Sequence, residues 1–365
     1  MNITVGDIIA ELEKHAPLNY QENYDNAGLI IGNPAMQATS ALLCFDVTET
    51  IVDEAIEKKS NLIISHHPPI FSGLKKINGT NCTERIVVKA IQNNIAIYSS
   101  HTNLDSVWGG INTVLAEKLG LENIRILLKT EKRLFKIVTF VPEAYSEKVR
   151  RAMFDAGAGC IGNYDSCSYN LSGAGTFRGG DNTNPFAGKK GIFHTEPEIR
   201  IETVAKKENV NKIVAALKTN HPYEEPAYDV YQLENSLDNV GVGAIGTLPE
   251  PTEANDFLSK IKKNLSVKII RHNNLFKKIE TVAVCGGSGS AYINSAIEAK
   301  ADIFVTGDCK YHQFSDNQNK IILADIGHFE SEYFAAEIFY GVINKKFPNF
   351  AAYLSHRISN PVQYY

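Results

Sequence analysis

The sequence predicts an α/β protein in which a discontinuous α/β domain carries an inserted α+β domain. Short apolar strands alternate with amphipathic helices at both ends of the chain, which is typical of a buried, mixed but mainly parallel sheet. Between these ends the predicted order changes to βαββαβ, the ferredoxin-like arrangement. A length of 365 residues suits two domains, or one domain with a large insertion. We therefore expect residues 1–125 and 240–365 to form the α/β domain and residues 126–239 to form the insert.

The N-terminal third supplies the first half of the expected α/β domain. Val5, Ile8 and Leu12 recur at helical spacing, and Thr4 is available as the N-cap. Further along, apolar positions at helical spacing alternate with short apolar runs. These patterns predict strands at 41–45, 61–65 and 95–98, and helices around 51–56 and 86–91.

The same alternation returns in the last third of the chain. It predicts strands at 281–285, 302–305 and 320–324, a helix around 293–297, and a long helix from about residue 331. The middle segment is different. It predicts strands at 135–141, 168–178, 191–204 and 227–231, with helices around 149–156 and 210–217.

Composition and charge exclude several classes of protein. Lys and Arg number 37 against 41 Asp and Glu, which argues against a dedicated binder of nucleic acid or of a membrane surface. No apolar run approaches the roughly 20 residues that span a bilayer. The first residues lack the basic and apolar segments of a signal peptide. The six cysteines show neither C-x-x-C nor zinc-ribbon spacing, so we expect buried thiols in the cytoplasm.

Potential metal ligands follow three of the predicted strands. His66 and His67 end one strand and are followed by two prolines, and His101 and Asp105 follow the next. His328 and Glu332 follow a third strand and lie four apart, on one face of a helix. Because ligands of open α/β sheets bind at the carboxyl ends of strands, these side chains are predicted to converge on a metal site.

The chemistry of these side chains suits two divalent ions. Adjacent histidines in extended chain point in different directions, and a carboxylate commonly bridges two metals about 3.5–4 Å apart. Two ions bring four positive charges and the two carboxylates return two negative ones, so an anionic or phosphorylated ligand is favoured. Imidazole and carboxylate ligands suit zinc, iron, manganese or nickel, and the sequence does not choose among them.

The chain resembles the dinuclear-metal family of GTP cyclohydrolase 1 type 2 homologues, also called NGG-interacting-factor-three-like proteins. The matching segments lie in the expected order over nearly the whole chain: 24–29 (YDNAGL), 62–71 (LIISHHPPIF), 100–105 (SHTNLD), 305–308 with 311–312, 325–332 (DIGHFESE) and 359–364 (SNPVQY). The chain departs from the family at Tyr24, where tryptophan is common, and at Gln313-Phe314, after His312.

The resemblance implies specific roles. His66 and Asp105 would hold one metal, His67 and His328 the other, and Glu332 would bridge both, with His101 as a further ligand or as a partner of one. It also implies a homohexameric toroid and a PII-like or CutA-like insert that includes the segment 221–226 (HPYEEP). The implied activity is that of a metal-hydroxide hydrolase acting on a nucleotide or other phosphorylated substrate.

Two alternatives to this activity stay open. The chain is then either a non-enzymatic metal-binding regulator or scaffold that senses a small ligand through its insert, or a metal-dependent phosphatase.

Other signals carry less weight. Asp308 and His312 follow another strand, and they are candidates for a general acid or base near the metals or for a hydrogen-bonded loop pair. The segment 241–246 (GVGAIG) matches a dinucleotide-binding pattern, but the prolines after it oppose the required helix, so we expect a flexible connection. The turn 286–290 (GGSGS) precedes a helix and is either an anion site or a tight turn.

Overall fold

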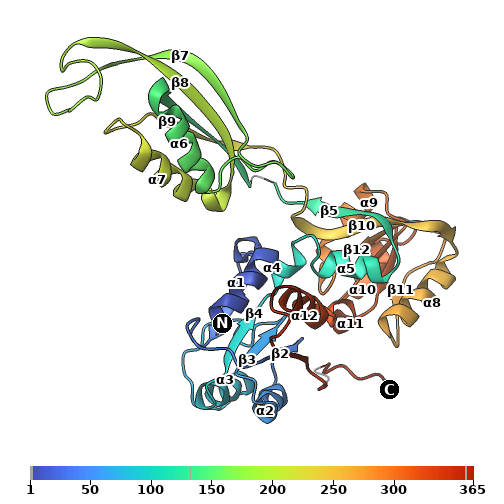
Figure 1. Ribbon diagram of the computed structural model, residues 1–365. Coiled ribbons are helices and arrows are strands. Elements are labelled where there is room, and N and C mark those ends of the chain that lie inside the picture. Colours follow the sequence, from blue (N-terminus) through green and yellow to red (C-terminus); the bar gives the residue numbers. More distant parts are fainter. Residues whose placement is uncertain (1–2, 132, 358–359) are drawn as a thin grey trace. The chain divides into compact units, whose positions relative to one another are not determined.

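A computed structural model describes residues 3–131, 133–357 and 360–365 (Figure 1). It divides into two compact units, Met1–Lys129 with Asp238–Tyr365, and Thr130–Leu237. Met1, Asn2 and Ser359, which belong to sequence features discussed above, lie outside the described residues. The predicted α/β class is confirmed, since helices alternate with strands that form several mixed sheets.

The first unit contains two sheets, so the single sheet expected from the sequence is wrong. The first sheet has the order β1-β4-β3-β2-β15, with parallel pairing except between β1 and β4. Its strands are β1 (Gly28–Ile31), β2 (Ala41–Cys44), β3 (Leu62–Ser65), β4 (Ala96–Ser99) and β15 (Ala352–Leu354). The helices in the same sequence segments are α1 (Val5–His15), η1 (Leu18–Tyr20), α2 (Glu49–Glu57), α3 (Cys82–Gln92) and α12 (Ala335–Lys346).

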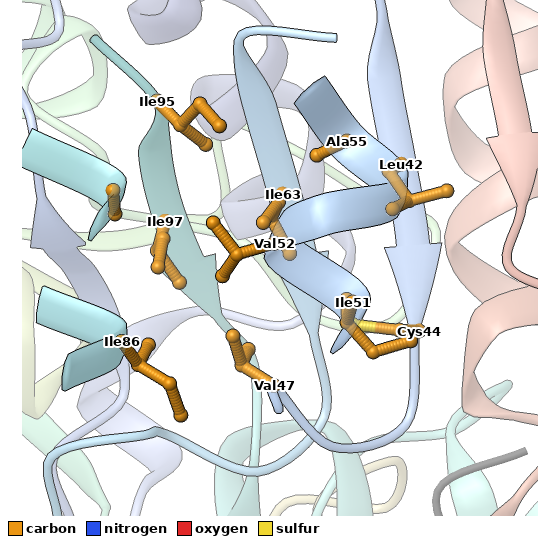
Figure 2. Close-up of a cluster of buried hydrophobic side chains, with 11 residues drawn as sticks. Leu42, Cys44, Val47, Ile51, Val52, Ala55, Ile63, Ile86, Ile95 and Ile97 are labelled. Carbon is orange, nitrogen blue, oxygen red and sulfur yellow. The ribbon is translucent and has the colours of Figure 1, made fainter. Parts of the chain in front are cut away.

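The core of the first sheet fixes the strands that lead to the predicted ligands. Apolar side chains of β2, β3 and β4 meet those of α2 and α3 in one buried cluster (Figure 2). Leu42, Val52 and Ile63 are fully buried there. The predicted N-cap of α1 is confirmed, because the Thr4 hydroxyl accepts a hydrogen bond from the Asp7 amide at 3.1 Å.

The second sheet of this unit has the order β11-β14-β13-β12-β10-β5. Its strands are β5 (Glu122–Lys129), β10 (Gly241–Thr252), β11 (Arg271–His272), β12 (Ile279–Val284), β13 (Ile303–Thr306) and β14 (Ile322–Asp325). The helices in these segments are α4 (Thr102–Asp105), α5 (Ile111–Lys118), α8 (Ala254–Leu265), η3 (Gly289–Tyr292), α9 (Ile293–Glu298), α10 (Tyr311–Asp316) and α11 (His328–Glu332). The long helix predicted from residue 331 is therefore two helices, α11 and α12.

The flexible connection expected at residues 241–246 is wrong, because these residues belong to strand β10. This strand lies between β5 and β12 and pairs antiparallel with both. A Cβ atom on Gly241 would lie 2.1 Å from the carbonyl oxygen of Leu128, and one on Gly246 would lie 2.7 Å from that of Glu122. Gly243 has a φ of +66°. The glycines therefore allow close approach of the strands rather than phosphate binding.

The second unit is a four-stranded antiparallel sheet with two helices (Figure 1). The elements follow in the order β6 (Leu134–Pro142), α6 (Glu143–Asp155), β7 (Ser168–Arg178), β8 (Phe193–Lys206), η2 (Lys207–Asn209), α7 (Val210–Asn220) and β9 (Tyr228–Leu233). The strand order is β7-β8-β6-β9. Side chains of α6 and α7 share a buried cluster with one face of the sheet, so among the described residues of this unit no α-helix covers the other face.

Within the described residues, none of the helices combines the length and the apolar character needed to cross a bilayer.

Candidate metal centre

The potential ligands lie at the carboxyl ends of strands from both sheets of the first unit. His66 and His67 directly follow β3, and both of their amides donate to the carbonyl of Phe45 at 3.1 Å. His101 follows β4 and precedes Asp105 on α4, whereas His328 and Glu332 begin and end α11, just beyond β14. The three strands do converge, but not at one sheet edge as predicted: β3 and β4 belong to the first sheet and β14 belongs to the second.

Nitrogen and oxygen atoms of these residues approach one another closely. The Glu332 Oε2 atom lies 3.6 Å from His66 Nε2, 3.5 Å from His67 Nε2 and 3.1 Å from His328 Nε2. Three groups of ligand atoms have the proximity needed to hold a metal ion: His66, His67 and His101; His67, His328 and Glu332; and His66, Asp105 and Glu332. Glu332 belongs to two of these groups, and so does each of His66 and His67.

Three buried atoms at this point have no hydrogen-bond partner in the described part of the chain. They are His66 Nε2, Asp105 Oδ1 and Glu332 Oε2. His66 Nε2 lies 3.6 Å from each of the two oxygens. An unsatisfied buried polar atom costs roughly 1–3 kcal/mol, so three that face one another require an explanation. A cation among them satisfies all three at once.

Each histidine of the cluster is held through its Nδ1 atom, which leaves Nε2 facing the centre. The partners are Ser100 O for His66 at 2.9 Å, Asp46 Oδ1 for His67, Asp25 Oδ1 for His101 and Asp308 Oδ2 for His328, the last three at 2.7 Å. Metal-binding histidines characteristically donate their second ring N–H to a carboxylate or a backbone carbonyl. The cluster has this arrangement at four histidines.

The pKa values of the cluster show that its carboxylates favour a nearby positive charge. Burial lowers the pKa of His67, but the hydrogen bond with Asp46 and the nearby carboxylate of Glu332 outweigh it and raise this pKa to about 9. In His328 burial also acts to lower the pKa, but the carboxylates of Glu332 and Asp308 outweigh it and raise the pKa to about 10. Burial and the charge of Glu332 raise the pKa of Asp105 to about 8. In Glu332 burial acts to raise the pKa, but the three histidines hold it well below its ordinary value.

The donor set fits the metals expected from the sequence. Imidazole nitrogens and carboxylate oxygens suit zinc, iron, manganese and nickel. Cys285 is buried beside the cluster, and burial with the charges of Asp105 and Glu332 raises its pKa far above the ordinary thiol value. A thiol kept protonated in this way is a poor metal ligand.

A cavity of about 260 Å³ adjoins the cluster, lined among others by Tyr24, His101, Asp105 and the glycine turn that follows β12. The amides of this turn are already used: Gly286 donates to Asn112, Gly287 to Ser331, and Gly289 to Thr306, at 2.8, 2.9 and 3.1 Å. The turn therefore does not bind an anion through these three amides, and the tight-turn alternative describes it better.

Asp308 and His312, the two predicted acid–base residues, have different surroundings. Asp308 accepts hydrogen bonds from Ser288 and from the His328 ring. It therefore contacts a candidate ligand, but it does not belong to the three groups of potential ligand atoms. Burial acts to raise its pKa, but the hydrogen bond from His328 lowers it. His312 is exposed on α10, where its ring lies against Tyr311.

Sequence reasoning missed Asp25 and Asp46, which orient two of the histidines. Asp46 lies two residues beyond β2, at the same sheet edge as His66 and His67, and this position was a usable signal. Asp25 lies in a loop before β1, and its pKa is about 2 because hydrogen bonds from His101 and Thr102 outweigh the effect of burial. No periodic pattern marks such a loop residue, and the signal available for Asp25 was its place in the segment 24–29 that carries the family resemblance.

Replacing Asp46 by alanine should weaken metal binding by about 10–100-fold, because His67 loses the acceptor that orients its ring. Metal content after dialysis against graded chelator concentrations measures this change. Asp53→Ala is the matched control, since Asp53 pairs with Lys89 on the surface of the same sheet's helices. Equal retention of metal by both variants contradicts the role of Asp46.

Metal removal should make the stability of the protein depend on pH in the alkaline range. The raised pKa values of His67 and His328 contribute stability that is full below the unfolded value near 6.5 and is lost as the pH rises through about 9 and 10. Bound metal would take the place of these protons. We therefore expect the thermal midpoint of chelator-treated protein to fall between pH 6.5 and 10, more steeply than that of metal-reloaded protein. Parallel curves for the two samples contradict this expectation.

Three kinds of comparison relate the chain to known proteins. The family model Duf34/NIF3 (NGG1p interacting factor 3) matches residues 3–361. The "GTP cyclohydrolase 1 type 2 homolog" of Halalkalibacterium halodurans is 41% identical over 90% of this chain and 89% of its own length, and that of Staphylococcus epidermidis is 34% identical over 99% of both. The crystal structure of a Bacillus cereus protein related to NIF3 covers 100% of both chains with a TM-score of 0.83 and 37% identity. The chain therefore belongs to the Duf34/NIF3 family.

Proposed function

We propose that the chain holds two divalent metal ions in this cluster and hydrolyses a nucleotide or another phosphorylated substrate. The observation that carries the proposal is the set of three buried, unpartnered atoms of His66, Asp105 and Glu332. In this proposal His66 and Asp105 hold one ion, His67 and His328 hold the other, and Glu332 bridges them. His101 either binds an ion directly or orients what binds there.

A bound pair of divalent ions would activate water and neutralise charge on the oxygens of a substrate. The residues of the chain prepare the site for this chemistry. The anchored Nδ1 atoms fix the imidazoles before metal binds, which lowers the ordering cost. Two ions and two carboxylates leave a net charge of about +2, which favours an anionic substrate.

Two exposed aromatic rings beside the cluster support a substrate with a planar ring. The Tyr24 ring is 65% exposed, lines the 260 Å³ cavity and lies 6.3 Å from the ring of Phe71. Phe71 in turn lies 6.3 Å from the His101 ring. Aromatic faces of this kind stack with heterocyclic bases. The names of the relatives make GTP the first substrate to test.

The direct test is to incubate metal-loaded protein with GTP and to measure formate and phosphate release. Formate identifies ring opening, whereas phosphate without formate identifies a phosphatase. A parallel screen of nucleotides and phosphoesters, with metal content measured on the same sample, extends the test beyond GTP. Absence of turnover by fully metal-loaded protein in this screen contradicts the hydrolase proposal.

The rival function is a metal-binding regulator or scaffold without turnover. His67→Ala separates the two, because the hydrolase proposal requires loss of turnover with the oligomer preserved. A homohexamer, as the family resemblance implies, is the assembly we propose, and a cytoplasmic location is proposed with it. If loss of metal dissociates the assembly and no substrate is turned over in the wild type, the scaffold function is favoured.

A further inference from the structure

The cavity beside the metal cluster is also lined by residues that hold no metal in the proposed function. Glu22, Tyr24 and Tyr292 belong to this part of its lining. The cavity volume of about 260 Å³ lies below the roughly 300–1,000 Å³ of sites that hold drug-sized ligands. A small molecule that fills the cavity therefore contacts both the metal cluster and these three residues.

Glu22 brings a negative charge to the cavity that the described part of the chain leaves without a partner. Its side chain is half-buried and has neither a hydrogen bond nor an ion pair there. Glu22 belongs to none of the three groups of potential metal ligands. Its backbone is fixed, since its amide donates to the Thr102 hydroxyl at 2.9 Å and its carbonyl accepts from the Asp25 amide at 3.0 Å. A carboxylate held in this way attracts a positively charged group.

Two tyrosine rings lie near this carboxylate. Burial raises the pKa of Tyr24, and the charge of Glu22 adds to the effect. Burial also raises the pKa of Tyr292, with smaller contributions from Cys285 and Glu22. Both phenols therefore stay neutral, and the faces of their rings can lie against a cation. Aromatic faces are a common means by which proteins recognise ammonium groups, and a carboxylate beside them adds a charged acceptor.

The lining offers little to a chain of several phosphoryl groups. Among the described residues that line the cavity, none is a lysine or an arginine. Several hydroxyls and amides of the lining already donate to other groups of the chain, namely those of Thr102, Ser106, Ser288, Gly286 and Gly289. Proteins bind successive phosphoryl groups through arginine, lysine or free backbone amides. The metal cluster can therefore serve one phosphoryl group, and a second one would meet the charge of Glu22.

We propose, on the basis of the metal centre and the hydrolysis proposed above, that the substrate is a small phosphate monoester that carries a positively charged nitrogen. Its phosphoryl group lies at the metal cluster, and its nitrogen lies against Glu22 and the rings of Tyr24 and Tyr292. Two divalent ions and the carboxylates of Glu22, Asp105 and Glu332 leave a net charge of about +1. A phosphate ester brings about 1.5–2 negative charges, and the nitrogen restores neutrality. An alkyl group in its place would leave Glu22 desolvated without a partner.

O-Phosphoethanolamine and propyl phosphate test this proposal, because they have nearly the same size and differ by an ammonium group in place of a methyl group. Calorimetric titration of the metal-loaded full chain near pH 7 should show that O-phosphoethanolamine binds about tenfold or more tightly than propyl phosphate. If a probe is hydrolysed, its KM from phosphate release replaces the titration. Equal binding of the two probes, or no binding of O-phosphoethanolamine, overturns the proposal.

One variant and one control locate the nitrogen. Glu22→Gln should reduce the preference to about threefold or less, because the amide lacks the charge that meets the ammonium group. It should bind propyl phosphate at least as tightly as the wild type does, since a negative charge near the phosphate is removed, and its metal content should be unchanged. Glu11→Gln, whose carboxylate pairs with Lys14 on the surface of α1, should keep the wild-type preference. A full preference in Glu22→Gln places the nitrogen elsewhere and overturns the proposal.

Metal content and phosphate release, measured on the same samples, separate failure of this proposal from failure of the hydrolase proposal. Hydrolysis of phosphate esters without a preference for the ammonium group overturns the cationic substrate and leaves the hydrolase intact. A preference that depends on Glu22, in metal-loaded protein that hydrolyses neither probe nor any ester of the screen, supports the recognition of the nitrogen and contradicts the hydrolase.

Discussion

Replacing Glu332 by glutamine should reduce the metal content by at least one ion per chain and lower any hydrolytic turnover by about 100-fold or more. The amide keeps the size of the side chain but loses the charge that meets three histidines, at 3.1–3.6 Å from their Nε2 atoms. It also cannot bridge two ions as a carboxylate does. Metal analysis of the purified variant and turnover measured at saturating metal give the two effects separately.

The matched control for this variant is Glu337→Gln, which removes a carboxylate that pairs with Lys118 on the surface of α12. It should retain wild-type metal content and turnover. Circular dichroism of both variants checks that they are folded. Full metal occupancy in folded Glu332→Gln would show that Glu332 is not a ligand.

Replacing Gly287 by alanine should destabilise the protein by at least about 2 kcal/mol and weaken metal binding at the same time. Gly287 has a φ of +57°, which an L-residue with a side chain rarely adopts. Its new Cβ atom would lie 2.4 Å from the Glu332 Oε1 atom, so the carboxylate must move away. Urea unfolding of metal-free protein measures the first effect, and chelator competition measures the second.

Gly341→Ala is the control for the same chemical change. Gly341 is exposed on α12, and a Cβ atom there meets nothing within 4 Å. The change should leave metal binding intact and stabilise the protein by about 0.5–1 kcal/mol, since alanine favours a helix interior. If Gly287→Ala binds metal as tightly as Gly341→Ala, the glycine turn has no part in holding Glu332.

The elements near the metal cluster were the most predictable from the sequence. Continuous apolar runs mark β2, β3 and β4 because all their residues are buried. His66 directly follows β3, and His101 and His328 lie within three residues of the ends of β4 and β14. Such runs do not specify which strands pair, so the division of the first unit into two sheets was not predictable. The sequence placed histidines and carboxylates beyond the ends of these strands. The partners of the histidine Nδ1 atoms depend on tertiary contacts and could not be predicted.

Strand β10 was missed for a different reason. Its glycines read as a loop in isolation, because glycine weakens a strand unless neighbouring backbones approach closely. That close approach, to Leu128 and Glu122 of β5, exists only after β5 and β10 have come together across more than 100 intervening residues. Local propensity therefore misleads where the determining contact is distant in the sequence.

The pairing of β5 with β10 has a consequence for how this chain can change in evolution. Lys129 and Gly241 are direct partners in that antiparallel pair, so the whole 130–237 unit occupies the position of a hairpin turn. A short turn joining the two strands preserves their register and every proposed metal ligand. The unit can thus be lost, gained or exchanged as a module in a single genetic event, without refashioning the centre around Glu332.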